Sequence, residues 1–291
     1  MIIHERIPPL LYEYSISSSS QDGLNLPRLI LKTGGFKDDA ISETISRNRC
    51  SLEVFSEDKK KIEILHKTFK RLKLPGLVLG SKSLKPAQWL TRWKSQWKPL
   101  SLTKRIDVVP FWYKDKYKTT KEVIVLDTLM SFGTGLHETT QLIAQLIEDS
   151  RLKFESFLDI GTGTGILTLV ALKNGAKTAT ALDISPLSIE AAKSNLKANA
   201  LNAKCVLGDI NQLPSNPKYD VVAANLITND LLKYRRKILS LVKPGGILLT
   251  SGISLDNLDK INKGFNVPSL IPRKISKGKE WAAILYVKKM S

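Results

Sequence analysis

The feature that most constrains the fold is a regular alternation, from about residue 104 onward, of short apolar runs with amphipathic segments of helical length. Runs that are apolar throughout, separated by amphipathic helices, are typical of parallel strands buried on both faces. The sequence therefore predicts an α/β fold with a doubly wound, Rossmann-like sheet. Strands are expected at 122–126, 157–160, 179–182, 204–207, 220–224 and 246–250, an antiparallel edge strand at 282–287, and helices from Thr139, Gly165, Pro186 and Asn229.

Residues 1–82 lack this alternation and indicate a small α+β domain. A helix is predicted where Ile62, Leu65 and Phe69 share one face, and it ends before Pro75 and Gly76. The other expected elements are strands at 10–18 and 52–56, a helix at 38–49 and a short apolar run at 77–79.

A linker helix is predicted between the two domains, over 83–103. Trp89, Trp93 and Trp97 recur every four residues there, which places them on one helix face, and the helix is expected to end before Pro99. Such a stripe is more often part of a packed core than a ligand site. We therefore expect three parts: a small α+β domain at 1–82, the linker at 83–103 and the α/β domain at 104–291.

Positive charge is concentrated in one part of the chain. The net charge is +18, and residues 59–121 hold 18 Lys or Arg against 3 acidic residues, which is +15 of that total. Such a block attracts polyanions, nucleic acid above all, and the interleaved tryptophans, with Trp112, offer stacking surfaces for RNA bases. The alternative is a solvated basic face beside an ordinary aromatic packing seam. The sequence favours neither interpretation.

Other features limit the class of protein. Cys50 and Cys205 have neither a disulfide framework nor zinc-site spacing, so no metal is expected. No run approaches the ~20 apolar residues of a membrane span. Residues 1–9 lack the pattern of a signal peptide. We expect a cytoplasmic protein without a membrane partner.

The residues that carry the chemistry begin with a glycine-rich turn after the strand at 157–160. Asp159 precedes Gly161, Gly163 and Gly165, and the third glycine comes two residues after the second. In the dinucleotide-binding turn the third glycine comes three residues after the second, a spacing that seats a pyrophosphate at the start of a helix. The spacing here favours an adenosyl ligand without phosphates. Asp183 ends the next strand, 22 residues beyond Gly161, where a carboxylate can bind ribose hydroxyls or cap the following helix.

Further candidates lie at the ends of other strands and before a helix. Asp209 is expected either to face the adenine edge or to act as a turn residue, and Asn225 ends an apolar strand and is expected to point into the ligand crevice. Thr139 or Thr140 is expected to cap the helix that begins there. His137 by itself is more often structural than catalytic.

Several runs together resemble the bacterial ribosomal protein L11 methyltransferase family. They are Phe-Gly-Thr-Gly-Leu-His-Glu-Thr-Thr at 132–140, Leu-Asp-Ile-Gly-Thr-Gly-Thr-Gly-Ile-Leu at 158–167, Val-Ala-Ala-Asn-Leu-Ile at 222–227, Lys-Pro-Gly-Gly at 243–246 and Ser-Gly-Ile at 251–253. The first run is the most specific, because most methyltransferases of this fold share the glycine turn.

The resemblance implies a seven-stranded methyltransferase sheet behind a small ferredoxin-like domain that grips the ribosomal substrate. It implies S-adenosylmethionine as cofactor, with contacts at Thr140, Gly161, Asp183 and Asn225. Together with Gly163 and Asp209 from the glycine turn and the strand ends, these are the expected cofactor-binding residues, and Asn225, His137 and Glu138 are the catalytic candidates. It also implies methylation of amino groups of ribosomal protein L11, on lysine side chains and an N-terminal amine. Leu136 and Glu138 depart from the family pattern, which has Thr and Pro there.

Alternatives remain within and beyond this class. Methylation of ribosomal RNA or of another protein is favoured by the basic 59–121 region. A non-catalytic RNA-binding factor on the same fold is opposed by the intact glycines and Asp183. The glycine spacing opposes a nicotinamide oxidoreductase.

Overall fold

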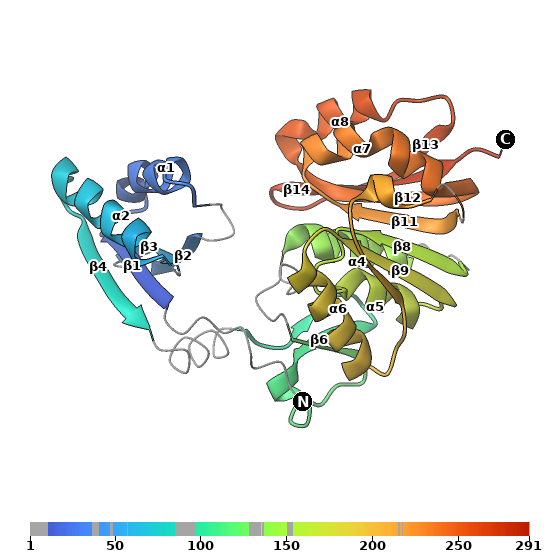
Figure 1. The fold of residues 1–291 in the computed structure, drawn as a ribbon, viewed down its shortest axis with the longest axis horizontal. Coiled ribbons are helices and arrows are strands. Elements are labelled where there is room, and N and C mark those ends of the chain that lie inside the picture. Colours follow the sequence, from blue (N-terminus) through green and yellow to red (C-terminus); the bar gives the residue numbers. More distant parts are fainter. Residues whose placement is uncertain are drawn as a thin grey trace. The chain divides into compact units, whose positions relative to one another are not determined.

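The computed structural model describes residues 11–36, 41–46, 49–56, 58–84, 97–127, 135, 137–149, 154–214, 216 and 218–290. The chain forms two compact units, an N-terminal unit, Met1–Trp97, and a C-terminal unit, Lys98–Ser291 (Figure 1). No helix in the described ranges is long and apolar enough to span a bilayer.

The N-terminal unit has the strand and helix order β-α-β-β-α-β. Its antiparallel sheet has the strand order β2-β3-β1-β4, which is the ferredoxin-like arrangement. Side chains from the sheet and both helices form one core, including Tyr14, Leu31 and Phe69. The elements are β1 Leu11–Ser18, η1 Asp22–Leu24, α1 Asn25–Thr33, β2 Ile41–Ser46, β3 Arg49–Ser56, α2 Lys59–Leu72 and β4 Val78–Leu84.

Two details of this unit correct the sequence expectations. The helix expected at 38–49 is wrong, because Ile41–Ser46 is strand β2, paired with β3. Ile41 and Ile45 are four residues apart, a spacing that fits one face of a helix as well as one face of a strand, so the pairing with β3 decides the structure here. Helix α1 was not predicted, although it buries Pro27 and Leu31.

The linker helix expected over 83–103 falls mainly on residues 85–96, which lie outside the described part of the chain. Trp97 is described and is buried, with 2% of its surface exposed, as a core position requires. No helix extends to the end of the expected range, because Leu100–Ser101 is strand β5.

The C-terminal unit contains a seven-stranded sheet with the order β10-β9-β8-β11-β12-β14-β13. Five strands run parallel, and β14 is antiparallel to both of its neighbours. These strands are β8 Ser156–Ile160, β9 Thr178–Asp183, β10 Lys204–Leu207, β11 Tyr219–Asn225, β12 Val242–Ser254, β13 Leu270–Lys277 and β14 Trp281–Lys288. The α/β prediction is confirmed, but β14 is an interior strand, because the unpredicted β13 forms the edge.

Helices cover both faces of this sheet (Figure 1). Alternate strand residues, such as Leu158, Val222 and Leu248, share one core with residues of α7 and α8, while α4, α5 and α6 pack on the other side. The central strands are therefore buried on both faces, as their apolar sequences predict. The helices are α4 Glu138–Asp149, α5 Ile166–Lys173, α6 Pro186–Ala198, α7 Thr228–Leu241 and α8 Leu258–Gly264, with short 3-10 turns η4 Ile210–Gln212 and η5 Leu255–Asn257.

A separate three-stranded sheet precedes this α/β core. It has the order β5-β6-β7, with β6 at Ile106–Pro110, β7 at Glu122–Leu126 and a 3-10 turn, η3, at Phe111–Tyr113. The strand predicted at 122–126 therefore exists but belongs to this small sheet. Asn199, directly after α6, connects β7 to the α/β core. Its side-chain carbonyl accepts the Val125 N–H at 2.8 Å, and its Nδ2 donates to the Val125 carbonyl at 2.7 Å.

Candidate cofactor and methyl-transfer site

The candidate site lies where the order of the parallel strands reverses. From β8 the chain passes to β9 on one side, whereas from neighbouring β11 it passes to β12 on the other. Ligands of open α/β sheets bind at this point, beyond the carboxyl ends of the strands. Gly161 follows β8, Asp183 ends β9 and Asn225 ends β11, so the fold brings these three predicted residues to one edge.

The glycine turn has a backbone that requires glycine. Gly161, Gly163 and Gly165 have φ values of 73°, 55° and 82°, in the left-handed region. A Cβ on Gly161 would lie 2.8 Å from Cδ2 of Leu226, and one on Gly165 would lie 3.2 Å from the backbone of Ala192. The backbone can therefore approach both a ligand and the neighbouring helix.

Asp159 stabilises the glycine turn through hydrogen bonds to Thr162 and Thr168. From the sequence we noted only that it precedes the turn. Its Oδ2 accepts hydrogen bonds from the Thr162 hydroxyl at 2.7 Å and from the hydroxyl and N–H of Thr168 at 2.8 and 3.1 Å. The residue is 1% exposed, and burial raises its pKa to about 6, although the hydrogen bonds from Thr162 and Thr168 lower it.

This pKa predicts a pH-dependent contribution of Asp159 to stability. The folded protein keeps the proton up to about pH 6, whereas the unfolded chain releases it near pH 4, so stability is lost as pH rises through this window. Relative to Asp159→Asn, which cannot ionise, the native protein should lose up to about 3 kcal/mol of unfolding free energy between pH 4 and 7. Urea unfolding of both proteins across this range measures the difference, and parallel pH profiles would contradict the prediction.

Asp183 connects the glycine turn to the start of α6. Its Oδ2 accepts the N–H of Gly163 at 3.0 Å and its Oδ1 accepts the N–H of Ser185 at 2.9 Å. The helix cap itself is Ser185, whose hydroxyl accepts the N–H of Ser188. A carboxylate offers about four acceptor positions, so Asp183 retains capacity for two ribose hydroxyls.

Asn225 and Thr140 meet across 85 residues of sequence. The Asn225 Nδ2 lies 3.4 Å from the Thr140 hydroxyl oxygen, in the first turn of α4. Thr140 is 1% exposed and Asn225 is half-buried at the end of β11. Because the Asn225 Nδ2 is directed to Thr140, the Asn225 carbonyl oxygen is oriented as an acceptor, and it has no hydrogen-bond partner among the described residues.

His137 lies beside this pair, at the start of α4. Its Nδ1 is 2.7 Å from the Thr139 hydroxyl, and its ring meets Trp281 edge-on with centroids 5.2 Å apart. Burial lowers the pKa of His137, and the carboxylates of Glu138 and Glu280 only partly oppose this. The imidazole is therefore neutral near pH 7. Within the described ranges no three His, Cys, Asp or Glu residues gather as metal ligands would.

Glu138 faces the turn between β13 and β14. One carboxylate oxygen accepts the N–H of Lys279 at 2.5 Å, and the other accepts those of Glu280 and Trp281 at 3.0 Å. Burial alone would raise the pKa of Glu138, but the three backbone hydrogen bonds outweigh it and the pKa is lowered. A Cβ on Gly278 would lie 2.1 Å from this carboxylate, so the contact also depends on glycine there.

Removing this carboxylate should loosen the turn. We expect Glu138→Ala to speed hydrogen exchange of the Lys279, Glu280 and Trp281 amides at least tenfold, because each loses an ionised acceptor worth about 1.5 kcal/mol or more. Glu138→Gln, which retains one carbonyl oxygen, should give an intermediate rate. Glu155→Gln is the control, since Glu155 pairs with Lys177 on the surface. Unchanged exchange in Glu138→Ala would contradict this role.

Asp209 has a structural function in this structure. It caps η4 by accepting the Asn211 N–H at 2.8 Å, and its other oxygen accepts the Tyr234 hydroxyl at 3.0 Å. The Asn211 backbone hydrogen bond is the main cause of its lowered pKa. The Gln212 side chain completes a capping box. The turn interpretation is therefore realised, and adenine recognition by Asp209 stays a prediction.

A phosphate-free adenosyl cofactor fits these residues. The glycines allow the backbone turn that places the Gly163 N–H 3.0 Å from the Asp183 carboxylate, which keeps acceptor capacity beside this turn. The seven-stranded sheet, the turn after β8 and the acid that ends β9 together define an S-adenosylmethionine-dependent methyltransferase.

Comparison with known proteins identifies the family. Residues 16–289 match the family described as ribosomal protein L11 methyltransferase (PrmA). The chain belongs to this family. A ribosomal protein L11 methyltransferase from Pelobacter propionicus is 32% identical over 271 residues, which cover 88% of this chain and 86% of that protein. A protein of the same name from Listeria monocytogenes serotype 4a is 31% identical over 241 residues, covering 79% and 76%.

A solved structure agrees with this assignment. The crystal structure of ribosomal protein L11 methylase from Lactobacillus delbrueckii subsp. bulgaricus has a TM-score of 0.61 and 30% sequence identity. The match covers 66% of this chain and 99% of that chain.

Proposed function

We propose that this enzyme transfers methyl groups to amino nitrogens of ribosomal protein L11, on lysine side chains and on the N-terminal amine. The relatives described above carry this substrate in their names. The observation that carries the proposal is the Asn225 carbonyl, oriented by Thr140 at the strand-order reversal beside the glycine turn.

The chemistry requires alignment more than acid or base strength. S-adenosylmethionine, when bound, supplies a methyl group on a positively charged sulfur. Positioning of reacting groups contributes up to about 7–11 kcal/mol in favourable cases. The Asn225 carbonyl accepts a hydrogen bond from the substrate amine and directs its lone pair, while Gly161, Gly163 and Asp183 fix the adenosyl group.

The substrate amine must also lose a proton, because an ammonium has no lone pair. His137 is neutral near pH 7 and lies next to Thr139 and Thr140, so it is our proposed proton acceptor. The Nδ1 of His137 lies 2.7 Å from the Thr139 hydroxyl oxygen and 3.4 Å from the Thr139 backbone nitrogen, so Thr139 fixes the orientation of the imidazole ring. Glu138 is not our proposed proton acceptor, because three backbone N–H groups stabilise its ionised carboxylate and lower its pKa, which makes it a weaker base than an ordinary glutamate.

The remaining parts of the chain receive proposed roles. Residues 1–82 recognise the protein substrate, 83–103 link the domains and 104–291 carry out the transfer. The basic 59–121 region contacts ribosomal RNA when the substrate lies on the large subunit, since it holds 18 basic residues against 3 acidic ones. The reaction takes place in the cytoplasm, where ribosomes are assembled.

One experiment tests the substrate. The protein is incubated with cofactor labelled in its methyl group and with dissociated ribosomal components, after which protein and RNA are separated. We expect label in ribosomal protein L11, stable to hydrolysis as a methylated amine. Label in RNA would favour the alternative substrate. No label, together with no cofactor uptake by isothermal titration, would favour a binding factor without catalysis.

A further inference from the structure

A second hollow surface lies at the edge of the large sheet opposite the cofactor site. Strands β8 to β12 begin there, and a hollow of about 700 Å³ is lined by the first residues of these strands, including Ser156, Thr178, Lys204 and Tyr219. A neighbouring hollow of about 490 Å³ lies between α6 and β10. The two hollows are adjacent, since both are lined by Asn202 and Ala203, and together they make up one hollowed surface at this edge. We call it the amino-edge groove.

Among the residues that the structure describes, lysines are the only charged ones that line this groove. They are Lys177, Lys193, Lys197, Lys204, Lys218 and Lys243, and no carboxylate lines either hollow. Lys177 pairs with Glu155 and Lys243 with Asp220, both located just outside the lining. The other four lysines are exposed, and within the described ranges none has an ion pair. About four positive charges are therefore uncompensated along one groove.

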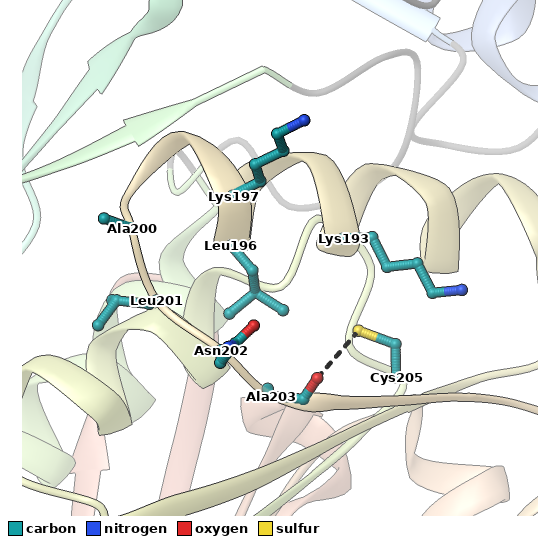
Figure 2. Close-up of a pocket in the computed structure, with 8 residues that line it drawn as sticks. All are labelled: Lys193, Leu196, Lys197, Ala200, Leu201, Asn202, Ala203 and Cys205. Atoms are coloured by element: carbon teal, nitrogen blue, oxygen red, sulfur yellow. Dashed lines mark hydrogen bonds between the residues drawn. The ribbon is translucent and has the colours of Figure 1, made fainter.

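The smaller hollow combines this charge with polar and apolar contacts (Figure 2). Lys193 and Lys197 come from neighbouring turns of α6, Leu196 lies between them, and Asn202 and Ala203 lead into β10 on the opposite side. In the larger hollow, Tyr219 adds an aromatic ring, whose hydroxyl is 3.2 Å from that of Thr180. The groove thus offers amide, hydroxyl and ring surfaces as well as charge.

The positive charges here affect one another. Burial lowers the pKa of Lys288, and the nearby charge of Lys218 lowers it further. Lys288 cannot relax away, because its ammonium donates to the carbonyls of Leu239 and Val242 at 2.8 and 2.9 Å. A bound anion would relieve this repulsion.

We propose that the amino-edge groove binds single-stranded RNA. Lysines are flexible point charges, and here they are spread over α6, β10 and the chain before β11, which suits several phosphates in succession better than one small anion. The Tyr219 ring packs against the core and offers only its accessible part to a base, and Asn202 supplies donors and acceptors for a base or sugar edge. This site is separate from the basic 59–121 region and from the cofactor edge, and it does not depend on which substrate is methylated.

Salt dependence gives a quantitative test. For single strands, the slope of log K against log salt changes by about 0.7 for each phosphate contact. We measure binding of the full-length protein to a fluorescent single-stranded RNA by anisotropy across a potassium chloride series. The double variant Lys204→Gln/Lys218→Gln removes two contacts and should flatten the slope by about 1.4. If the two proteins bind equally at 1 M salt, where the electrostatic contribution vanishes, this slope difference weakens binding by the variant about 25-fold at 0.1 M salt.

The matched control is Lys263→Gln/Lys277→Gln, which removes the same charge from α8 and β13. It should weaken binding less than threefold, and bound RNA should protect Lys204 and Lys218, but not Lys263, from acetylation. Equal weakening by both pairs, or no protection in the groove, would overturn the proposal. Competition by polyglutamate as strong as that by RNA would also overturn it. Cofactor affinity of the groove variant should be unchanged, which keeps this test distinct from that of the proposed function.

Discussion

Replacing Asn225 with alanine should lower kcat/KM for methyl transfer about 100-fold, with most of the loss in kcat. The side chain supplies the only carbonyl that we place against the acceptor amine, and its direction is set by the Thr140 hydroxyl. Loss of alignment by about 1 Å is enough to cost a factor of this size. The variant should fold normally, because Asn225 is only half-buried and the strand before it carries the packing.

Asn229→Ala is the matched control for this change. Asn229 is exposed in the first turn of α7, four residues further along the chain, and its described side-chain contact is with Lys260 at 3.0 Å. It should retain full turnover. Thr140→Ser should keep most activity and Thr140→Val should lose it, because the first retains the hydroxyl. Full turnover by Asn225→Ala would remove Asn225 from the site.

Replacing Asp183 with alanine should raise the dissociation constant of S-adenosylmethionine about 10- to 100-fold. The carboxylate is expected to accept the ribose hydroxyls, and hydrogen bonds to charged groups contribute about 1.5–3 kcal/mol. The same change removes two backbone hydrogen bonds, from Gly163 and Ser185, so part of the loss could come from a looser turn. Isothermal titration measures the affinity.

A cofactor analogue without the ribose hydroxyls separates these two causes. If Asp183 binds the ribose, the native protein should bind the analogue weakly, and Asp183→Ala should bind cofactor and analogue almost equally, since the interaction is already absent. Asp256→Ala, at an exposed position of η5, is the control and should behave like the native protein. If Asp183→Ala binds the analogue more weakly than the cofactor by the same factor as the native protein does, Asp183 does not bind the ribose and its role is structural.

The site could be predicted where it depends on local backbone chemistry. The glycines at 161, 163 and 165 have left-handed φ values, which other residues rarely adopt. The acid at the end of the next strand lies at the same edge of the sheet, because the carboxyl ends of parallel strands meet there. The same argument placed Asn225. The Thr140 contact could not be found in this way, because it depends on how α4 packs on the sheet.

The missed features are those that depend on distant parts of the chain. Glu138 binds residues 279–281, more than 140 positions away, and nothing near Glu138 in sequence indicates this. Strand β13 was missed because its exposed face is polar and it contains Pro272, which an edge strand tolerates. In the N-terminal unit, Ile41 and Ile45 have the four-residue spacing of a helix face, and the strand is determined by pairing with β3, which the local sequence does not indicate.

A crystal structure with the demethylated cofactor, S-adenosylhomocysteine, tests the central claim most directly. We expect its adenosyl group against the backbone of Gly161 and Gly163, with both ribose hydroxyls within about 3 Å of the Asp183 carboxylate. Its sulfur should point toward Asn225. A ligand bound elsewhere, or a crevice closed by side chains at the ends of β8 and β9, would contradict the account.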